Sequence, residues 1–381
     1  MAFLLSLSFL YGSLILAFTI GLLKTGRSVA RGKPVAADGD LPGLVSVIIP
    51  VRNEAGNICS ILGEMRGQDW PAGRLEVIVT DDFSEDNTMA LASSFLADFP
   101  AFPLVLVFPQ AGAGPGKKRA IARAIGKATG EVILCTDADT RRGPSWITSM
   151  AACFSGGATQ MVLGPVCLRP AANLLQKIQA LEFTGIMGST AGSASLGTPV
   201  MCNGANLAYR RQVFNETGGY ESSLRYGSGD DQFLMNAVGK RYGRKAIRFN
   251  FDLKAVVTTE PEPFLVGFIQ QRIRWVSKSR GYREPVVIAT GALTWLIHAA
   301  LMAGFMTGIF FPAILPMVFG CWLFKMVMEF PMVYTMTGFF GQRSLLGWFI
   351  PAQLFQLCYV TLVGLAGPFA TYRWKGRKGN N

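Results

Sequence analysis

The stretch LVSVIIPV, residues 44–51, is a run of apolar side chains rich in valine and isoleucine. Strands that are buried on both faces of a parallel sheet have this composition. The segment that follows, residues 54–67, spaces its apolar side chains as an α-helix does. Residues 44–51 therefore predict the first strand of a domain in which strands and helices alternate.

The same unit repeats along the chain. Apolar runs occupy residues 75–82, 104–108 and 131–139, and helical patterns begin near Glu85 and Gly116. Strands that alternate with helices in this way form parallel sheets with right-handed crossovers. The sequence therefore predicts an α/β fold with a mostly parallel, Rossmann-like sheet.

Polar side chains follow three of the four predicted strands. They are Asn53 and Glu54 after the first strand, Asp81 and Asp82 after the second, and Asp137 and Asp139 after the fourth. The carboxyl ends of parallel strands meet at one edge, where such sheets bind ligands. Carboxylates that crowd together there repel one another unless a cation or a donor-rich ligand lies among them. These strand ends are the first candidate functional site.

Asp137 and Asp139 are the candidate metal ligands. Residues two apart in an extended segment project to the same side, so both carboxylates can face one divalent cation. A solvated turn is the alternative, because the pairs Asp38/Asp40 and Glu260/Glu262 have the same spacing. Their position at a strand end favours the metal site.

Two nucleotide-binding motifs are excluded. The segment GAGPGKKR, residues 112–119, has Ala111 where a P-loop needs glycine and Lys118 where it needs serine or threonine. No GxGxxG follows the first strand, so a dinucleotide-dependent oxidoreductase is not supported. Two interpretations of the segment stay open: a turn that brings Lys117 or Lys118 to a phosphate, or a helix start with solvated lysines.

Asp230 and Asp231 stand directly before an apolar helical pattern, where either side chain could cap the helix. His298 is the only histidine in the chain, and it lies among apolar residues, which favours a structural role. Proton abstraction by this protein therefore falls to a carboxylate.

The N-terminal segment is typical of a membrane anchor. Residues 1–23 carry no charge and are long enough to cross a bilayer, and a basic linker follows at residues 24–43. Basic residues prefer the cytoplasmic side, so the C-terminal end of the anchor is expected there. A cleaved signal peptide is less favoured, because a basic start, a shorter apolar core and a cleavage site are not evident.

A second apolar region fills the C-terminal part. Residues 285–324 carry no charge and suit two helices of about 20 residues, and residues 344–372 supply another. We predict a transmembrane bundle of about three spans at residues 285–372, followed by a basic tail at residues 373–381. Three spans would place that tail outside, against the preference of basic residues for the cytoplasm, so the number of spans stays open.

Charged residues inside and before this region have two interpretations. Lys325 and Glu329 either pair on one helical face or mark the membrane surface, which leaves residues 330–340 ambiguous. Residues 261–284 predict an interfacial helix whose arginines also face a diphosphate, with leaflet contact alone as the alternative. Residues 174–187 are either a second surface-lying helix or part of the core.

Composition limits the partners. The formal net charge is +12 and half of the 381 residues are hydrophobic. An anionic leaflet and an anionic soluble substrate account for this charge in a chain with apolar ends, so nucleic acid is not an expected partner. Seven cysteines without paired spacing argue against a disulfide framework and a zinc site. The soluble part is therefore expected in the reducing cytosol.

A set of motifs occurs in a fixed order: VSVIIPVRNE, VIVTDDFSEDNT, CTDADT, CNGANLAYRR, GSGDDQFL and QRIRW. In this order they resemble the membrane-embedded family 2 glycosyltransferases, over roughly residues 44–280 and the flanking apolar segments. Cellulose, hyaluronan and poly-N-acetylglucosamine synthases share the pattern, and ceramide glucosyltransferases carry a close variant. The resemblance implies a GT-A domain at residues 44–260.

The resemblance also implies roles for individual residues. The implied donor-binding residues are Pro50, Asn53, Glu54, Asp81, Asp82, Lys118 and Asp137, of which Asp137 binds Mg²⁺ or Mn²⁺ together with Asp139. Asp231 matches the general base of the family's Glu-Asp pair, whereas Asp230 replaces the usual glutamate. The implied diphosphate and acceptor residues are Asp230, Gln271, Arg272, Arg274, Trp275, Asn203 and Asn206.

The implied reaction is an inverting transfer of a sugar from a nucleotide-diphosphate-sugar, with uridine the expected base, at the cytosolic face of the plasma or inner membrane. A bundle this small favours a lipid or lipid-linked acceptor, because polysaccharide synthases generally build a channel from more spans. The QRIRW motif is associated with processive synthases, so a processive polysaccharide synthase is the alternative. A non-catalytic membrane protein that binds nucleotide-sugars is less favoured.

Overall fold

The computed structural model describes residues 2–30, 41–110, 112, 114–169, 173–224, 226–227, 229–367, 369–374 and 377–379. Its contacts divide the chain into two units. The α/β unit consists of Gly26–Cys167 and Met201–Glu260, and the helical unit consists of Met1–Thr25, Leu168–Val200 and Pro261–Asn381. The segment Leu168–Val200, which lies within the predicted domain 44–260, thus groups with the helical unit.

A seven-stranded sheet forms the α/β unit, with the order β3-β2-β1-β4-β8-β6-β9. The parallel strands are β1 (Val45–Val51), β2 (Leu75–Asp81), β3 (Leu104–Val107) and β4 (Val132–Cys135). The other strands are β8 (Leu207–Arg210), which is antiparallel to both β4 and β6, and β6 (Met161–Leu163) with β9 (Ile247–Phe249), which are parallel to each other. The predicted mostly parallel sheet is confirmed.

The first strand is buried on both faces, as its composition predicts, because Val45, Val47, Ile48 and Ile49 are all fully enclosed. The helices of this unit are α2 (Ile58–Arg66), α3 (Thr88–Asp98), α4 (Lys117–Ile125), α5 (Trp146–Ala152), α7 (Arg211–Glu216) and α8 (Asp230–Tyr242). A small second sheet has the order β5-β10-β7, formed by Arg141–Arg142, Val257–Thr259 and Val166–Leu168.

The fourth strand is shorter than the predicted run of residues 131–139. It ends at Cys135, because the hydroxyl groups that follow bind backbone carbonyls and turn the chain. Thr136 donates from Oγ1 to the carbonyl oxygen of Ala205 at 2.9 Å, and Thr140 donates to that of Asp137 at 2.6 Å. Asp137 and Asp139 therefore lie in a turn just beyond the strand.

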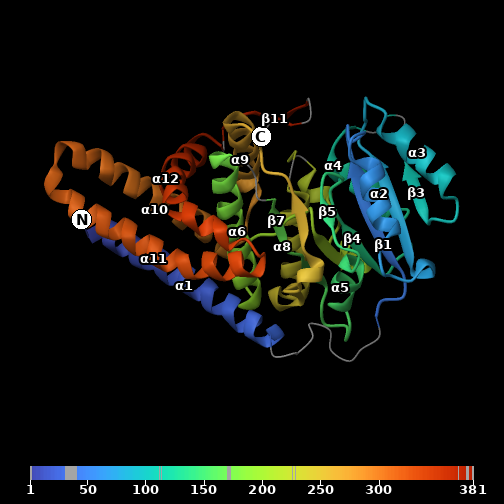
Figure 1. Cartoon of the computed structure of the whole chain (residues 1–381), viewed down its shortest axis with the longest axis horizontal. Helices are drawn as coiled ribbons and strands as arrows, with labels where there is room; N and C mark the ends of the chain where they lie inside the picture. Colours follow the sequence, from blue (N-terminus) through green and yellow to red (C-terminus); the bar gives the residue numbers. More distant parts are fainter. Residues whose placement is uncertain are drawn as a thin grey trace. The chain divides into compact units, whose positions relative to one another are not determined.

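The helical unit contains long apolar helices. Its helices are α1 (Ala2–Ala30, which belongs to this unit up to Thr25), α6 (Leu174–Ser195), α9 (Leu265–Ser277), α10 (Pro285–Phe310), α11 (Leu315–Phe339) and α12 (Phe349–Ala366). Helices α10 and α11 form an antiparallel hairpin (Figure 1). Among the described residues, four segments are long and apolar enough to cross a membrane: 2–26, 285–310, 312–339 and 343–366. In the tail, β11 (Tyr372–Trp374) pairs antiparallel with β12 (Arg377–Gly379).

A polar cluster lies inside the apolar helices. The predicted pair of Lys325 and Glu329 is confirmed, with an Nζ–Oε1 distance of 2.9 Å. Gln353 binds both side chains, and Tyr11 donates from its hydroxyl group to Glu329. His298 is buried, and its Nδ1 lies 2.7 Å from the carbonyl oxygen of Thr294, which agrees with a structural role. Residues 330–339 belong to α11, with Pro331 inside the helix.

Candidate active site

The ends of β1 and β2 lie next to each other, because Val51 pairs with Asp81. Asn53 follows β1 with φ at 53°, and its Oδ1 accepts a hydrogen bond from the amide of Glu85 at 2.8 Å. Asp81 accepts a hydrogen bond from the amide of Ser84 at 3.0 Å. The two candidate donor-binding side chains thus shape the same loop, residues 82–87.

Glu54 and Asp82 are buried at this edge, and each ties a loop in place. Glu54 accepts a hydrogen bond from Asn57 Nδ2 at 2.7 Å, while Asp82 accepts one from the amide of Gly116 at 2.6 Å. Pro50 is half-buried within β1, opposite Thr80. The bond from Gly116 to Asp82 brings the start of α4 to the strand ends.

Residues from distant parts of the chain meet at the start of α4. The ammonium group of Lys117 donates to Asp137 Oδ1 at 2.6 Å and lies 3.8 Å from Asp230 Oδ2. The amide of Gly204 donates to Asp231 Oδ2 at 3.0 Å. We call Lys117, Asp137, Gly204, Asp230 and Asp231 the acid–lysine cluster. It brings the fourth strand end and the start of α8 into one site.

Gly204 lies close to the side chains of the acid–lysine cluster. A Cβ there would lie 3.3 Å from Asp230 Oδ2 and 3.6 Å from Lys117 Nζ. The close approach leaves the backbone amide of this residue directed at Asp231. A side chain at this position would require the carboxylate of Asp230 to shift by a few tenths of an ångström.

Lys117 supplies a fixed positive charge. Burial lowers the pKa of Lys117, but Asp137 and Asp230 raise it by more, so its pKa lies well above the usual value. The ammonium group is therefore protonated at neutral pH. It is surrounded by the three carboxylates of the cluster, an excess of negative charge that suits an additional cation.

Lys118 has a different environment. It is buried, and it donates to the carbonyl oxygens of Ser223 at 2.7 Å and Tyr226 at 3.0 Å. These contacts tie the segment before α8 to α4. They favour Lys117, in place of Lys118, as the cation that meets a phosphate.

Asp137 and Asp139 have the donor chemistry of a divalent-cation site. Asp137 is half-buried, Asp139 is exposed, and Ala138 between them is buried, so both carboxylates turn away from the core. Among the residues that the structure describes, no three Asp, Glu, His or Cys side chains are grouped as a complete metal site. Two carboxylates with further oxygen ligands from a phosphate and water are a common arrangement for Mg²⁺, so the residues fit such a cation.

Asp230 and Asp231 occupy the first turn of α8, and the N-cap position belongs to Gly229, whose φ is 86°. The capping interpretation therefore does not account for either side chain. Both residues lie in the first turn, at the positive end of the helix dipole, where anionic groups are commonly found. Asp231 also accepts a hydrogen bond from the amide of Gln232 at 2.7 Å.

Asn203 and Asn206, two of the candidate acceptor residues, differ in burial and in their hydrogen bonds. Asn206 is 0% exposed; its Nδ2 donates to the carbonyl oxygens of Pro165 and Ala255 at 2.8 Å, and its Oδ1 accepts from Trp146 Nε1 at 3.0 Å. These contacts support a role in positioning the loop. Asn203 is half-buried, and its Oδ1 accepts a hydrogen bond from the amide of Ala205.

The substitution Asn206→Ala is expected to lower the free energy of unfolding by about 2–4 kcal/mol, because it leaves buried polar groups without partners. The apparent melting temperature should fall by roughly 5–10 °C, measured on detergent-purified protein. Asn203→Ala is the matched control, since it removes the hydrogen bond from the amide of Ala205 at a half-buried site. Equal melting temperatures for the two variants would contradict the positioning role.

The QRIRW residues Gln271, Arg272, Arg274 and Trp275 lie on α9 of the helical unit. Arg272 and Glu182 of α6 are 5% and 4% exposed, and they form a forked ion pair with N–O distances of 3.3 and 2.6 Å. Tyr359 of α12 also donates to Glu182. Burial lowers the pKa of Arg272 and Glu182 raises it by more, so the pKa of Arg272 lies above the usual value. The pair of Glu182 and Arg272, together with Tyr359, thus joins α6, α9 and α12. Gln271, Arg274 and Trp275 are only half-buried.

Glu182 is a residue that the sequence motifs do not indicate. Because an unpaired buried charge is costly, Glu182→Gln and Arg272→Met should each lower the free energy of unfolding by about 3–5 kcal/mol. The double variant should be less destabilised than the sum of the two, and thermal unfolding of all four proteins measures this coupling. Additive losses would show that the pair is not coupled.

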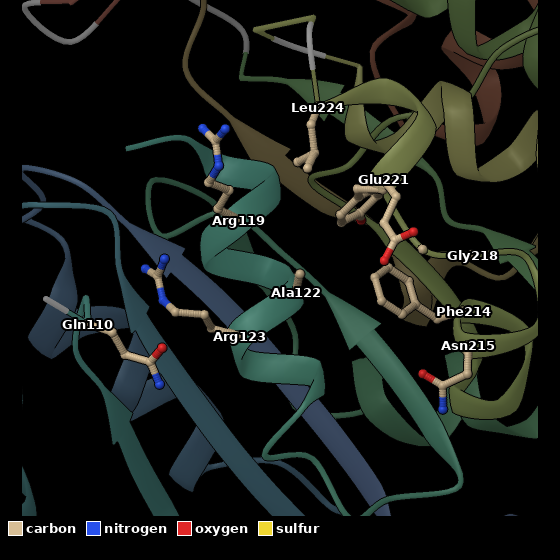
Figure 2. A pocket seen from close by; sticks show the side chains of 11 residues that line it. Gln110, Arg119, Ala122, Arg123, Phe214, Asn215, Gly218, Glu221 and Leu224 are labelled. Carbon is tan, nitrogen blue, oxygen red and sulfur yellow. The ribbon is translucent and has the colours of Figure 1, made fainter. Parts of the chain in front are cut away.

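A hollow of about 490 Å³ lies beside α4, where Arg119, Ala122 and Arg123 line it (Figure 2). Arg119 and Arg123 project on one side of it, and Phe214 and Glu221 lie on the other. Residues of the acid–lysine cluster do not line it. The hollow is therefore separate from the candidate active site.

Comparison with known proteins identifies the family and the type of fold. A family model described as glycosyl transferase family 21 matches residues 9–378. The mannosyltransferase PcManGT from Pyrobaculum calidifontis, solved in complex with GDP-Man and Mn²⁺, is 19% identical; the alignment covers 93% of this chain and 99% of that one, with a TM-score of 0.54. This likeness confirms the GT-A type of fold.

Curated relatives are also glycosyltransferases. Glycosyltransferase AglE of Haloferax volcanii is 26% identical over 52% of this chain and 62% of its own length. The N-acetylglucosaminyltransferase of Rhizobium meliloti is 26% identical over 61% of this chain and 54% of its own length. The matches thus span between half and two thirds of these relatives. The resemblance carried by the motifs is confirmed, and the chain belongs to glycosyl transferase family 21.

Proposed function

We propose that this protein transfers a sugar from a nucleotide-diphosphate-sugar to a lipid or lipid-linked acceptor, with inversion at the anomeric carbon. UDP-sugars are the first candidates for the donor. The observation that carries the proposal is the convergence of Asp137, Asp230 and Asp231 around Lys117 at the carboxyl end of the sheet. Glycosyltransferase relatives and a solved neighbour that binds GDP-Man support the donor class.

Asp231 acts as the general base in this proposal. Its carboxylate takes the proton of the acceptor hydroxyl group while that oxygen attacks the anomeric carbon. The bond from the anomeric carbon to the phosphate oxygen breaks, and the nucleoside diphosphate leaves with the electron pair. Attack opposite the leaving group inverts the configuration. The amide of Gly204 and the first turn of α8 hold the carboxylate for this step.

Asp137 and Asp139 would hold Mn²⁺ or Mg²⁺, and such a cation would stabilise negative charge on the leaving diphosphate. Lys117 provides a second, permanent positive charge beside Asp137. The neighbour PcManGT was solved with Mn²⁺, which supports divalent-cation use. Asn53, Glu54, Asp81 and Asp82 form the proposed nucleoside end of the site, where two adjacent strands end.

The apolar helices support a membrane location, with the α/β unit in the cytosol. An acceptor that is a lipid or is linked to one would then diffuse to the enzyme within the leaflet. The QRIRW motif of α9 favours a second candidate, a processive polysaccharide synthase. The two candidates share the donor site and differ in the size of the product.

Membranes that contain the protein should be incubated with a panel of radiolabelled nucleotide-sugars and Mn²⁺. The proposal expects one donor to yield a lipid-extractable product that carries one sugar, together with free nucleoside diphosphate. A long labelled chain would favour the processive synthase. Donor binding without release of nucleoside diphosphate, in the presence of membrane lipids, would favour a non-catalytic role.

A further inference from the structure

Helix α9 is too short to cross a membrane. Its 13 residues span about 20 Å, whereas the hydrocarbon core is about 30 Å thick. Only residues 260–264 separate it from β10 of the α/β unit. Helix α9 therefore lies on the same side of the membrane as the α/β unit.

Helix α12 runs alongside α9 in the same direction. The ring of Phe268 contacts those of Phe355 and Tyr359, with centroids 5.4 and 5.1 Å apart. Further along both helices, a Cβ at Gly367 would lie 2.9 Å from the side chain of Val276. The two contacts show that α12 lies beside α9 from Phe355 to Gly367, and α9 is too short to cross the membrane.

Helix α12 also lies crosswise to the hairpin of α10 and α11. Near its start, the ring of Phe349 is 5.3 Å from that of Phe330; near its end, the carbonyl oxygen of Thr361 accepts a hydrogen bond from Trp295 at 3.3 Å. Trp295 precedes the end of α10 by 15 residues, and Phe330 follows the start of α11 by 15 residues. Each separation corresponds to about 22 Å of helix. The contacts of α12 with α10 and with α11 therefore lie at the same distance from the hairpin turn.

The chain stays beside α9 after α12 ends. The guanidinium group of Arg280 lies 4.6 Å from the ring centre of Phe369, and β11 contacts α9. Length and composition alone would allow α12 to cross a membrane. The packing of α12 against α9 indicates instead that α12 stays on one side of the membrane.

The distribution of charge agrees with this position. If only α1, α10 and α11 cross, the basic segments that follow α1, α9, α11 and α12 all lie on one side. The opposite side then carries the hairpin turn at residues 311–314, FPAI, which has no charge. Basic residues prefer the cytoplasmic side, so this arrangement removes the conflict that three C-terminal spans create.

We propose that the chain crosses the membrane three times, with α1, α10 and α11, and that α12 lies in the leaflet on the side of the α/β unit. The exposed stripe of α12 faces the acyl chains and consists of Ile350, Leu354, Cys358, Leu362 and Leu365. A helix with one apolar face buried by about 5–10 Å is typical of this interface. The C-terminal tail is cytosolic.

Two single-cysteine additions to the full chain test the proposal: Ala313→Cys in the hairpin turn and Gly379→Cys in the tail, both in a Cys358→Ser background. Cells are treated with a membrane-impermeant maleimide before and after permeabilisation. Native Cys59, exposed on α2, reports the side of the α/β unit. We expect Cys59 and the cysteine at position 379 to be labelled only after permeabilisation, and the cysteine at position 313 to be labelled in intact cells.

Labelling of position 379 in intact cells, with Cys59 still protected, would overturn the proposal by showing that α12 crosses. Protection of position 313 in intact cells would overturn it by showing that the hairpin does not cross. The background protein without added cysteines measures the signal of the native thiols. Sugar transfer is not needed for either result, so the test is independent of the proposed function.

Discussion

Asp231→Asn is expected to lower kcat by roughly 10²–10⁴-fold, the usual contribution of a general base. The amide of asparagine cannot accept the proton of the acceptor hydroxyl group. Its carbonyl oxygen can still accept the hydrogen bond from Gly204, which holds position 231 at 3.0 Å in the structure. Folding and donor binding should therefore be retained while turnover is lost.

The measurement combines sugar transfer in membranes with donor affinity by nucleotide binding to purified protein. Asp98→Asn is the matched control, because it makes the same chemical change on an exposed residue at the end of α3. Asp98→Asn should leave both quantities near those of the unmodified protein. If Asp231→Asn turned over at a near-normal rate with donor bound, another group would have to be the base.

The fold was largely predictable because buried parallel strands have a strong local signal. The runs at residues 44–51, 75–82 and 104–108 correspond within one residue at each end to β1, β2 and β3. The antiparallel strand β8 was not predicted, since its four residues sit in a segment read as part of a motif. β8 lies between β4 and β6, and so short a strand depends on pairing partners that a local pattern does not reveal.

The candidate site was predictable only in outline. Strand ends indicated which carboxylates meet, but the choice between Lys117 and Lys118 needed the position of the first turn of α4. Neighbouring helical residues point about 100° apart, so one lysine reaches Asp137 and the other binds backbone carbonyls. Glu182 was missed because its partner Arg272 is 90 residues away and α6 is buried on most of its surface.

Removal of divalent cations should have the second large effect. If a cation on Asp137 and Asp139 stabilises the leaving diphosphate by several kcal/mol, chelation should lower transfer by roughly 10³-fold, and added Mn²⁺ should restore it. The substitution Asp137→Asn should cause a loss of similar size that Mn²⁺ does not restore. It removes a ligand and also the partner that Lys117 holds at 2.6 Å.

Asp139→Asn separates the two contributions of that change. Asp139 is exposed, and the ion pair of Lys117 is formed by Asp137, so substitution of Asp139 should act on the cation and leave the pair of Lys117 and Asp137 intact. The Mn²⁺ concentration for half-maximal transfer should rise by about 10–100-fold, with kcat largely recovered at saturation. Asp98→Asn should keep the unmodified Mn²⁺ dependence. Full transfer in the presence of chelator would remove the metal from the mechanism and leave Lys117 as the cation that meets the diphosphate.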